Sequence, residues 1–185
     1  DYCYHRSLPN HQHLMFALAG LLAIAGCDSD SGPCPANAVI NVGHRGSGVN
    51  SDTNPLPENT IESFLEGVSD GATMIELDVA LSADDVLVVM HDATINRTTD
   101  GDGCVHDFTV AELQLLDAAA GTSLAGTGVV VPTLAETLSA LDADINIEIK
   151  VDDGSCPTGD LKELAQHVVD AMQEDGKERR FVISS

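Results

Sequence analysis

Positively charged residues are scarce in this sequence. Its 185 residues include 8 Lys and Arg against 30 Asp and Glu, which gives a formal net charge of −22 at pH 7. No cluster of basic residues is present that could bind a nucleic-acid backbone or an anionic lipid surface, so we expect no nucleic-acid partner. The acidic excess is typical of a solvated protein surface, and it also fits a halophilic source or a site that collects divalent cations.

Tryptophan is absent, and aromatic residues make up 3% of the chain. Their scarcity speaks against an enzyme that works inside a lipid surface, where such side chains are enriched. Apolar residues nevertheless account for 43% of the sequence, which is enough to bury a core. We therefore do not expect a disordered chain.

An unbroken run of apolar or small residues extends from Met15 to Gly26 and is followed by Cys27. The run is shorter than the about 20 residues that span a bilayer, and it has the length of a signal-peptide apolar region. Its end resembles the bacterial lipobox, in which the Cys is lipidated and becomes the mature N-terminus. A buried helix is the alternative, but residues 28–37 have the composition of a tether.

We therefore expect residues 1–26 to hold an upstream segment and a signal peptide, with translation beginning at Met15. Residues 27–38 would be a tether behind a lipid anchor at Cys27. The protein would then be an exported bacterial lipoprotein, anchored to a membrane and facing the periplasm or the cell exterior. Three cysteines remain for an oxidising compartment: Cys34, Cys104 and Cys156. They allow one bridge with one left over, and their spacing selects no pair and matches no zinc pattern.

From residue 39 onward, short apolar segments alternate with segments of helical period. Strands are expected at 39–44, 73–81, 86–92, 145–150 and 181–185. Helices are expected at 58–72 and 160–172, and after two capping boxes that begin at Thr109 and Thr133. The apolar faces of the two longer helices would include Phe64, Leu65, Leu161 and Leu164. Alternating strands and helices predict a parallel sheet covered by helices.

Two of these strands are apolar on one face and polar on the other, because side chains alternate along a strand. The apolar positions are Ile75, Leu77, Val79, Ile145, Ile147 and Ile149, and the polar ones are Glu76, Asp78, Asn146, Glu148 and Lys150. An open sheet covered on both sides would bury two apolar faces. A (β/α)8 TIM barrel explains the charged face, which would line the catalytic mouth. Since such a barrel needs roughly 250 residues, we expect residues 39–185 to be its N-terminal part, truncated to about the first five βα units.

The residues with reactive side chains gather at the carboxyl ends of the expected strands or just past them. They are His44, Arg45, Glu58, Glu76, Asp78, His91, Glu148 and Lys150. Crowded carboxylates raise one another's pKa, and a divalent cation would relieve the repulsion among Glu76, Asp78 and Glu148. All-oxygen ligation favours Mg²⁺ or Ca²⁺. The alternative is a structural ion-pair network of Glu76, Asp78 and Lys150.

His44 and His91 are candidates for a general acid and a general base, because histidine titrates near neutral pH. The guanidinium of Arg45 offers a planar fork for a phosphate oxygen, and Lys150 adds a point charge. A cation surrounded by these four side chains would suit attack on a phosphodiester. The alternative for each histidine is a hydrogen-bonded core residue.

Nine motifs in order resemble those of the glycerophosphodiester phosphodiesterase family over roughly residues 40–150: HRG, PENT, F-x-x-G, IELDV, VVMHD, RTTDGDG, T-x-x-EL, VPTLAE and NIEIK. The resemblance implies a (β/α)8 barrel that hydrolyses small glycerophosphodiesters to glycerol 3-phosphate and an alcohol. The metal ligands that it implies are Glu76, Asp78 and Glu148, with Glu58 as a further ligand or a support for one. The acid/base pair that it implies is His44 and His91, and the phosphate-binding side chains are Arg45 and Lys150.

We favour His91 as the base and His44 as the acid, although the motifs leave the reverse order open. Cys104 and Cys156 are additions to the family pattern, and both lie in loops that follow expected barrel strands, so a bridge between them over the mouth is the preferred pairing. Two alternative functions stay open. A related phospholipase C or D type of barrel would act on intact lipids, whereas a non-catalytic calcium-binding surface lipoprotein would keep the barrel without turnover.

Overall fold

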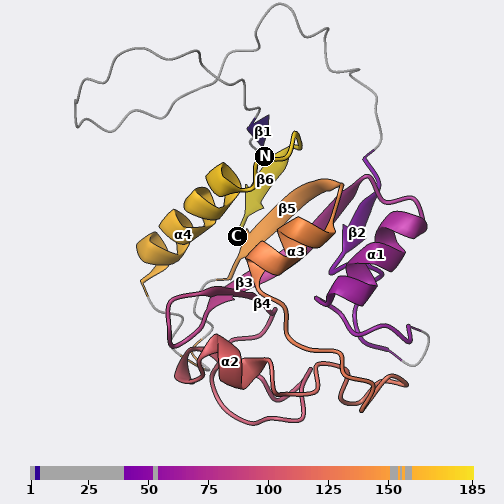
Figure 1. Ribbon diagram of the computed structural model, residues 1–185, viewed down its shortest axis with the longest axis vertical. Coiled ribbons are helices and arrows are strands. Elements are labelled where there is room, and N and C mark those ends of the chain that lie inside the picture. Colours follow the sequence, from indigo (N-terminus) through magenta and orange to yellow (C-terminus); the bar gives the residue numbers. More distant parts are fainter. Residues whose placement is uncertain (1–2, 5–39, 52–53, 151–153, 155, 157–159) are drawn as a thin grey trace, which may run out of the picture.

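A computed structural model describes residues 3–4, 40–51, 54–150, 154, 156 and 160–185 (Figure 1). The expected signal peptide, the lipid site at Cys27, the tether and Cys34 lie outside these residues. Among the residues that are described, no helix combines the length and the apolar character that crossing a membrane requires.

One sheet forms the centre of the structure. Its strands are β1 (Cys3–Tyr4), β2 (Val42–His44), β3 (Met74–Leu81), β4 (Leu87–Val89), β5 (Asp144–Ile149) and β6 (Phe181–Ser184). The strand order is β1-β6-β5-β3-β2, with β4 paired to β3 off this path. The pairs β2–β3, β3–β5 and β5–β6 are parallel, whereas β1 runs antiparallel to β6. Parallel neighbours joined through helices are the arrangement expected of a (β/α)8 barrel, and the fold class predicted from the sequence is confirmed.

The strand expected at 86–92 is present as β4, but it does not join the sheet as a parallel strand. Strand β4 runs antiparallel to the end of β3, with Val79 opposite Val89 and Leu81 opposite Leu87. Residues 82–86 connect the two strands, and a link this short cannot return the chain to a parallel start, which takes about a dozen residues or more. Asp85 adopts the left-handed conformation in this turn, with φ 59°. The described residues therefore contribute four parallel strands rather than the five expected.

Three of the four described α-helices pack against one face of the sheet. The four helices are α1 (Ile61–Ser69), α2 (Val110–Leu113), α3 (Leu134–Ala140) and α4 (Leu161–Glu174), with a 3₁₀ turn at Val105–Asp107. Both predicted capping boxes are present: Thr109 caps α2 with Glu112, and Thr133 caps α3 with Glu136. Figure 1 shows α1, α3 and α4 beside the parallel strands, and α2 at one end of the sheet with the loops around it.

The main core lies between these helices and the apolar face of β3 and β5. Ile75, Leu77, Ile145 and Ile147 are fully buried, and they pack in one cluster with side chains of α1, α3 and α4. The alternation predicted for the two strands is therefore confirmed, and the opposite face is left to the polar residues.

Two helical positions expected in this core lie at the surface instead. Leu65 is 49% exposed and Leu161 is 41% exposed, whereas Phe64 and Leu164 are buried. A helix turns by about 100° per residue, so neighbours along the chain cannot both face the sheet. Phe64 takes the inward position in α1, and Leu65 is turned away.

A second buried cluster stabilises the long excursion between β4 and β5. It is built from Val88, Met90, Ile95, Val105, Leu113, Ala118, Ala119, Val129 and Val131. The segment that follows β4 is thereby held against its own apolar core. This packing fixes the loop that carries His91 and the residues after it.

Candidate active site

On the polar face of the sheet, predicted site residues lie opposite one another in neighbouring strands. His44 is the register partner of Glu76, and Asp78 is the register partner of Glu148. Side chains of register partners in adjacent strands project from the same face of a sheet. Glu76 is 6% exposed and Asp78 is fully buried, so these carboxylates lie within the fold rather than on its surface.

The carboxylate cluster consists of Glu76, Asp78 and Glu148. One oxygen from each side chain lies within 4.8 Å of the others. Burial, together with the nearby charges of Asp78 and Glu148, raises the pKa of Glu76 to about 7, although the backbone amide of Arg45 donates a hydrogen bond to its Oε2 at 2.9 Å. The second oxygen of Glu76, Oε1, is buried and accepts no hydrogen bond within the described part of the chain. A divalent cation with oxygen ligands fits this donor set, because it would neutralise the cluster and occupy the unpaired oxygen.

Lys150 lies beside the carboxylate cluster. Its Nζ is 2.6 Å from Glu148 Oε1 and 3.0 Å from Asp78 Oδ1. Burial acts to lower the pKa of Lys150, but the hydrogen bonds to Glu148 and Asp78 outweigh it, so the pKa is raised and the side chain stays charged. An ion-pair network thus accounts for Asp78 and Glu148 but leaves Glu76 without a positive side chain among the ion pairs of the described residues, apart from His44 at 3.9 Å.

The HRG turn directs Arg45 toward the same face. Arg45 adopts the left-handed conformation with φ 52°, and Gly46 follows with φ 94°. A Cβ atom on Gly46 would lie 2.5 Å from Ser63, so the turn requires glycine for both its conformation and its close packing against α1. The guanidinium of Arg45 reaches Glu58 Oε1 at 2.8 Å, and its Nε lies 3.4 Å from Asp78 Oδ2.

Glu58 is not part of the carboxylate cluster, and two arginines bind its carboxylate. Arg97 donates to both of its oxygens, from Nη1 at 3.0 Å and from Nη2 at 2.8 Å. The backbone amide of Asn50 also donates to Oε2 at 3.0 Å. Burial acts to raise the pKa of Glu58, but the hydrogen bonds from Arg97, Asn50 and Arg45 lower it to about 2. Glu58 is not one of the three carboxylates that gather in the cluster, and its contacts fit the supporting role, one of the two roles predicted for it.

The two histidines differ in how firmly they are held. His91 Nδ1 is 2.5 Å from Asp92 Oδ1, and the His91 side chain is 29% exposed. The His44 side chain is 57% exposed, and its nearest charged partner is Glu76, with Nε2 3.9 Å from Oε2. The backbone amide of Met90 donates to the carbonyl of Asp78 at 3.0 Å, which brings the segment of His91 to the strand that carries the cluster.

The sequence pattern of the glycerophosphoryl diester phosphodiesterase family matches residues 44–185. The chain belongs to this family. It is 38% identical over 148 residues to the glycerophosphodiester phosphodiesterase of Caldanaerobacter subterraneus subsp. tengcongensis, a match that covers 80% of this chain and 58% of the relative. It is 38% identical over 90 residues to the rat glycerophosphodiester phosphodiesterase 1, with 49% of this chain and 26% of the relative covered.

Solved structures of the family have the same architecture. A phosphodiesterase of Oleispira antarctica, in complex with the product sn-glycerol-3-phosphate, is 30% identical and superposes with a TM-score of 0.64 over 77% of this chain and 55% of that one. A glycerophosphodiester phosphodiesterase of Agrobacterium tumefaciens is 33% identical, with a TM-score of 0.56 over 73% of this chain and 54% of that one. These matches cover 58% of the bacterial relative, 26% of the rat relative and about 55% of the two solved structures, so the chain spans only part of each.

Three further residues of the site were given no role in the prediction from the sequence, although each lies in one of its motifs. Asn59 donates from Nδ2 to Asp78 Oδ2 at 2.9 Å and adopts a left-handed backbone with φ 59°, which asparagine tolerates. Asp92 accepts from His91, and Arg97 joins Asp92 to Glu58. All three lie in family motifs, namely PENT, VVMHD and RTTDGDG. The sequence signal that could have indicated a role was their position next to predicted site residues. Their hydrogen-bond partners depend on the fold and could not be read from the sequence.

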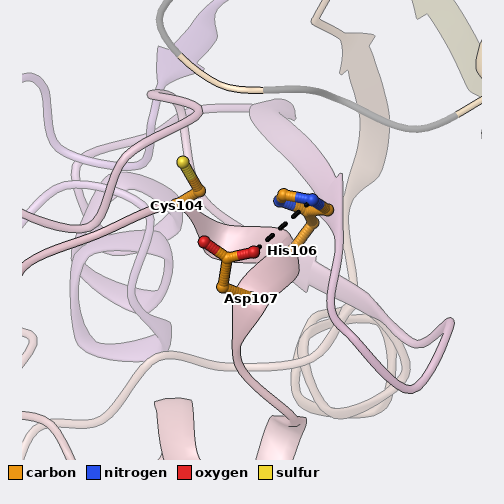
Figure 2. Close-up of side chains that lie close together, drawn as sticks. All are labelled: Cys104, His106 and Asp107. Atoms are coloured by element: carbon orange, nitrogen blue, oxygen red, sulfur yellow. Dashed lines mark ion pairs between the residues drawn. The ribbon is translucent and has the colours of Figure 1, made fainter.

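Cys104 and Cys156 form a disulfide, the pairing preferred from the sequence. Cys104 also lies close to His106 and Asp107 in a group with the geometry of a metal site (Figure 2). A disulfide sulfur has no thiolate to offer a metal, so this group is not a metal site in this family member.

Proposed function

We propose that this protein hydrolyses glycerophosphodiesters to glycerol 3-phosphate and an alcohol, with a divalent cation at the carboxylate cluster. The observation that carries the proposal is the cluster itself. Three carboxylates from β3 and β5 converge on the polar face, with one buried oxygen unpaired and a raised pKa at Glu76. Membership of the family supports the reaction, and the product bound to the Oleispira antarctica phosphodiesterase supports glycerol 3-phosphate as the product released here.

Glu76, Asp78 and Glu148 would hold the cation. The oxygen ligands favour Mg²⁺ or Ca²⁺ over zinc. When bound, the ion would polarise a phosphoryl oxygen and offset the negative charge that develops during hydrolysis. Lys150 already contacts two of the three ligands, so it would lie next to any phosphate that approaches them.

Arg45 and Lys150 would bind the phosphate. An arginine has five N–H donors, and the contacts of Arg45 with Glu58 and Asp78 leave donors of its guanidinium for a phosphate oxygen. With Glu58 ionised at neutral pH, Arg45 has a fixed counter-ion and is held in place before a substrate arrives.

His44 and His91 would move the protons. The pairing of Asp92 with Nδ1 of His91 directs the Nε2 atom outward as the group that exchanges a proton with the reacting oxygens. We favour His91 as the base, because its orientation is fixed, and His44, which is more exposed, as the acid that meets the leaving alcohol.

We also propose that the protein acts as an exported lipoprotein, anchored through Cys27 and facing the periplasm or the cell surface. The run from Met15 to Gly26 and the tether composition after Cys27 support this proposal. The disulfide between Cys104 and Cys156 is consistent with an oxidising compartment. Mass spectrometry of the membrane fraction would test it, because lipidation adds the mass of acyl chains to the peptide that begins at Cys27.

The activity is tested by the release of glycerol 3-phosphate from glycerophosphocholine. The full-length protein is used, with any sequence that its gene encodes after Ser185. Release that EDTA abolishes and that Mg²⁺ or Ca²⁺ restores is the expected result. Glu76→Gln should abolish release, whereas Glu66→Gln, the same change on the exposed side of α1, should leave it unchanged.

The same assay separates the alternatives. Cation binding without turnover of any diester would point to a calcium-binding surface lipoprotein. Turnover of bilayer lipid alone would point to a phospholipase. Either result would overturn the proposed reaction.

A further inference from the structure

Arg97 lies between the proton-transfer side and the phosphate-binding side of the site. We propose that Arg97 is a positioning residue, which holds Asp92 behind His91 and Glu58 behind Arg45 with a single guanidinium. This inference rests on the proposed function for its kinetic consequence, but the geometry that carries it stands in the protein without substrate.

One edge of the Arg97 guanidinium binds Asp92. Nε donates to Asp92 Oδ2 at 2.6 Å, and Nη2 donates to Asp92 Oδ1 at 3.0 Å. The hydrogen bond from Arg97, together with that from His91, lowers the pKa of Asp92 to about 2 in spite of its partial burial. Asp92 is therefore an ionised acceptor for His91 Nδ1, and a proton on Nδ1 leaves Nε2 as the working nitrogen.

The other edge of the guanidinium binds Glu58. Nη1 and Nη2 donate to its two oxygens, so Arg97 makes a second two-point contact with a carboxylate that is 1% exposed. Glu58 in turn accepts a 2.8 Å hydrogen bond from Arg45 Nη1, so a fixed Glu58 also fixes the position of Arg45. The series His91, Asp92, Arg97, Glu58 and Arg45 is continuous. Arg45 also contacts two carboxylates, but with a single contact to each: Glu58 at 2.8 Å and Asp78 at 3.4 Å.

Backbone hydrogen bonds and buried packing order the loop that carries Arg97. The backbone amide of Ile95 donates to the carbonyl of Gly103, and that of Thr99 donates to the carbonyl of Ile95. Ile95 is fully buried in the second cluster, and a Cβ atom on Gly101 would lie 2.7 Å from it. The cavity beside His91, Glu58 and Thr98 has a volume of about 10 Å³, which is room for about one water. Glu58 and His91 therefore have little free volume beside them, whereas the Arg97 side chain is 43% exposed and is held by its hydrogen bonds to Asp92 and Glu58.

Lysine cannot replace arginine in this arrangement. Two flat two-point contacts need the planar fork of a guanidinium, whereas an ammonium is a point charge. Arg97→Lys should therefore keep the charge and lose the geometry. Misplacement of a catalytic group by about 1 Å can cost roughly 100-fold in rate. We expect kcat to fall by roughly 100-fold with a smaller change in KM.

Two measurements on the full-length protein test this inference. ¹⁵N NMR of His91, with His91→Gln used for assignment, should show the Nδ1–H tautomer in the wild type and a mixture of tautomers in Arg97→Lys. In Arg97→Gly, added ethylguanidinium should restore kcat, and ethylammonium should not. The matched control is Arg180→Lys, which alters an arginine that binds Asp144 at the opposite end of β5 and should leave both measurements unchanged.

The NMR result does not depend on turnover, so it separates the two proposals. If the wild type hydrolyses no diester but the tautomer of His91 changes in Arg97→Lys, the proposed function fails and the positioning role stands. If Arg97→Lys keeps the wild-type tautomer and the wild-type kcat, the positioning role is wrong. A loss of kcat in Arg97→Gly that ethylammonium repairs as well as ethylguanidinium would also overturn it, because charge alone would then suffice.

Discussion

The carboxylate cluster and the Arg97 network are neighbouring groups of charged side chains that differ in how fully their carboxylates are paired. In the cluster of Glu76, Asp78 and Glu148, the side chains of Lys150 and Arg45 pair with Asp78 and Glu148 but not with Glu76, whose pKa is raised. In the network of Asp92, Arg97 and Glu58, every carboxylate has an arginine, and the pKa of Glu58 and that of Asp92 are lowered to about 2. The network is complete within the protein, whereas the cluster has capacity for a further positive charge. The network would then position the site, and the cluster would hold the cation proposed above.

The largest effect should follow from a change in the cluster. Glu148 is its most exposed member, and Glu148→Gln keeps the shape while removing one ligand charge. Loss of a cation that contributes several kcal/mol to the transition state should lower kcat/KM by roughly 1,000-fold. Kinetics of glycerophosphocholine hydrolysis, with calorimetric titration of Mg²⁺ and Ca²⁺, would measure it. A variant that binds the cation as the wild type does would contradict the assignment.

A divalent cation should stabilise the folded protein through the cluster. A ligand that binds only the folded state at 100 times its Kd adds about 2.7 kcal/mol to the free energy of unfolding. Urea unfolding with and without the cation is the measurement. Glu76→Gln should abolish the increase, and the stability of Glu58→Gln should still rise, since Glu58 belongs to the network. An equal increase in both variants would mean that the cation binds elsewhere.

Acid should weaken the network. The pKa of Glu58 is about 2 in the folded protein, against an ordinary value of 4.5 in the unfolded chain. Its contribution is therefore fully present above the unfolded pKa and is lost as the pH falls from 4.5 through 2. Between pH 6 and pH 2.5, the free energy of unfolding should fall by roughly 2 kcal/mol more in the wild type than in Glu58→Gln. Urea unfolding across this range would show it, and equal losses in the two proteins would contradict the ion pairing.

The smallest effect is expected at Asn50, which supports the network from the loop after HRG. Its Oδ1 accepts a hydrogen bond from the backbone amide of Glu58 at 2.7 Å. Asn50→Ala removes this acceptor and should lower the free energy of unfolding by about 1 kcal/mol. Cation affinity should stay unchanged, because Asn50 does not contact the cluster. A changed affinity would show that the two groups are coupled more closely than the contacts indicate.

Local patterns predicted most of the fold. The two capping boxes and the alternation in β3 and β5 depend on residues a few positions apart, and all of them are present in the structure. The direction of β4 was mistaken because apolar character marks a strand but not its orientation. The short link at 82–86 indicates an antiparallel pair, because a parallel connection needs about a dozen residues or more.

The site was predicted less completely than the fold. Register alone brings Glu76, Asp78 and Glu148 together, since strands β3 and β5 are neighbours. Glu58 was less predictable, because its partner Arg97 is 39 positions away along the chain and reaches it through an irregular loop. The position of such a loop depends on its own buried cluster, which no motif describes.

The bond between Cys104 and Cys156 has a practical consequence for preparing the protein. It links the loop after His91 and Asp92 to the loop after Glu148 and Lys150, two segments separated by 52 positions. Material produced in a reducing cytosol would lack this covalent link, and only non-covalent packing would hold Cys104 near Cys156. Kinetic and metal-binding values from such material would describe a looser protein than the one that an oxidising compartment makes.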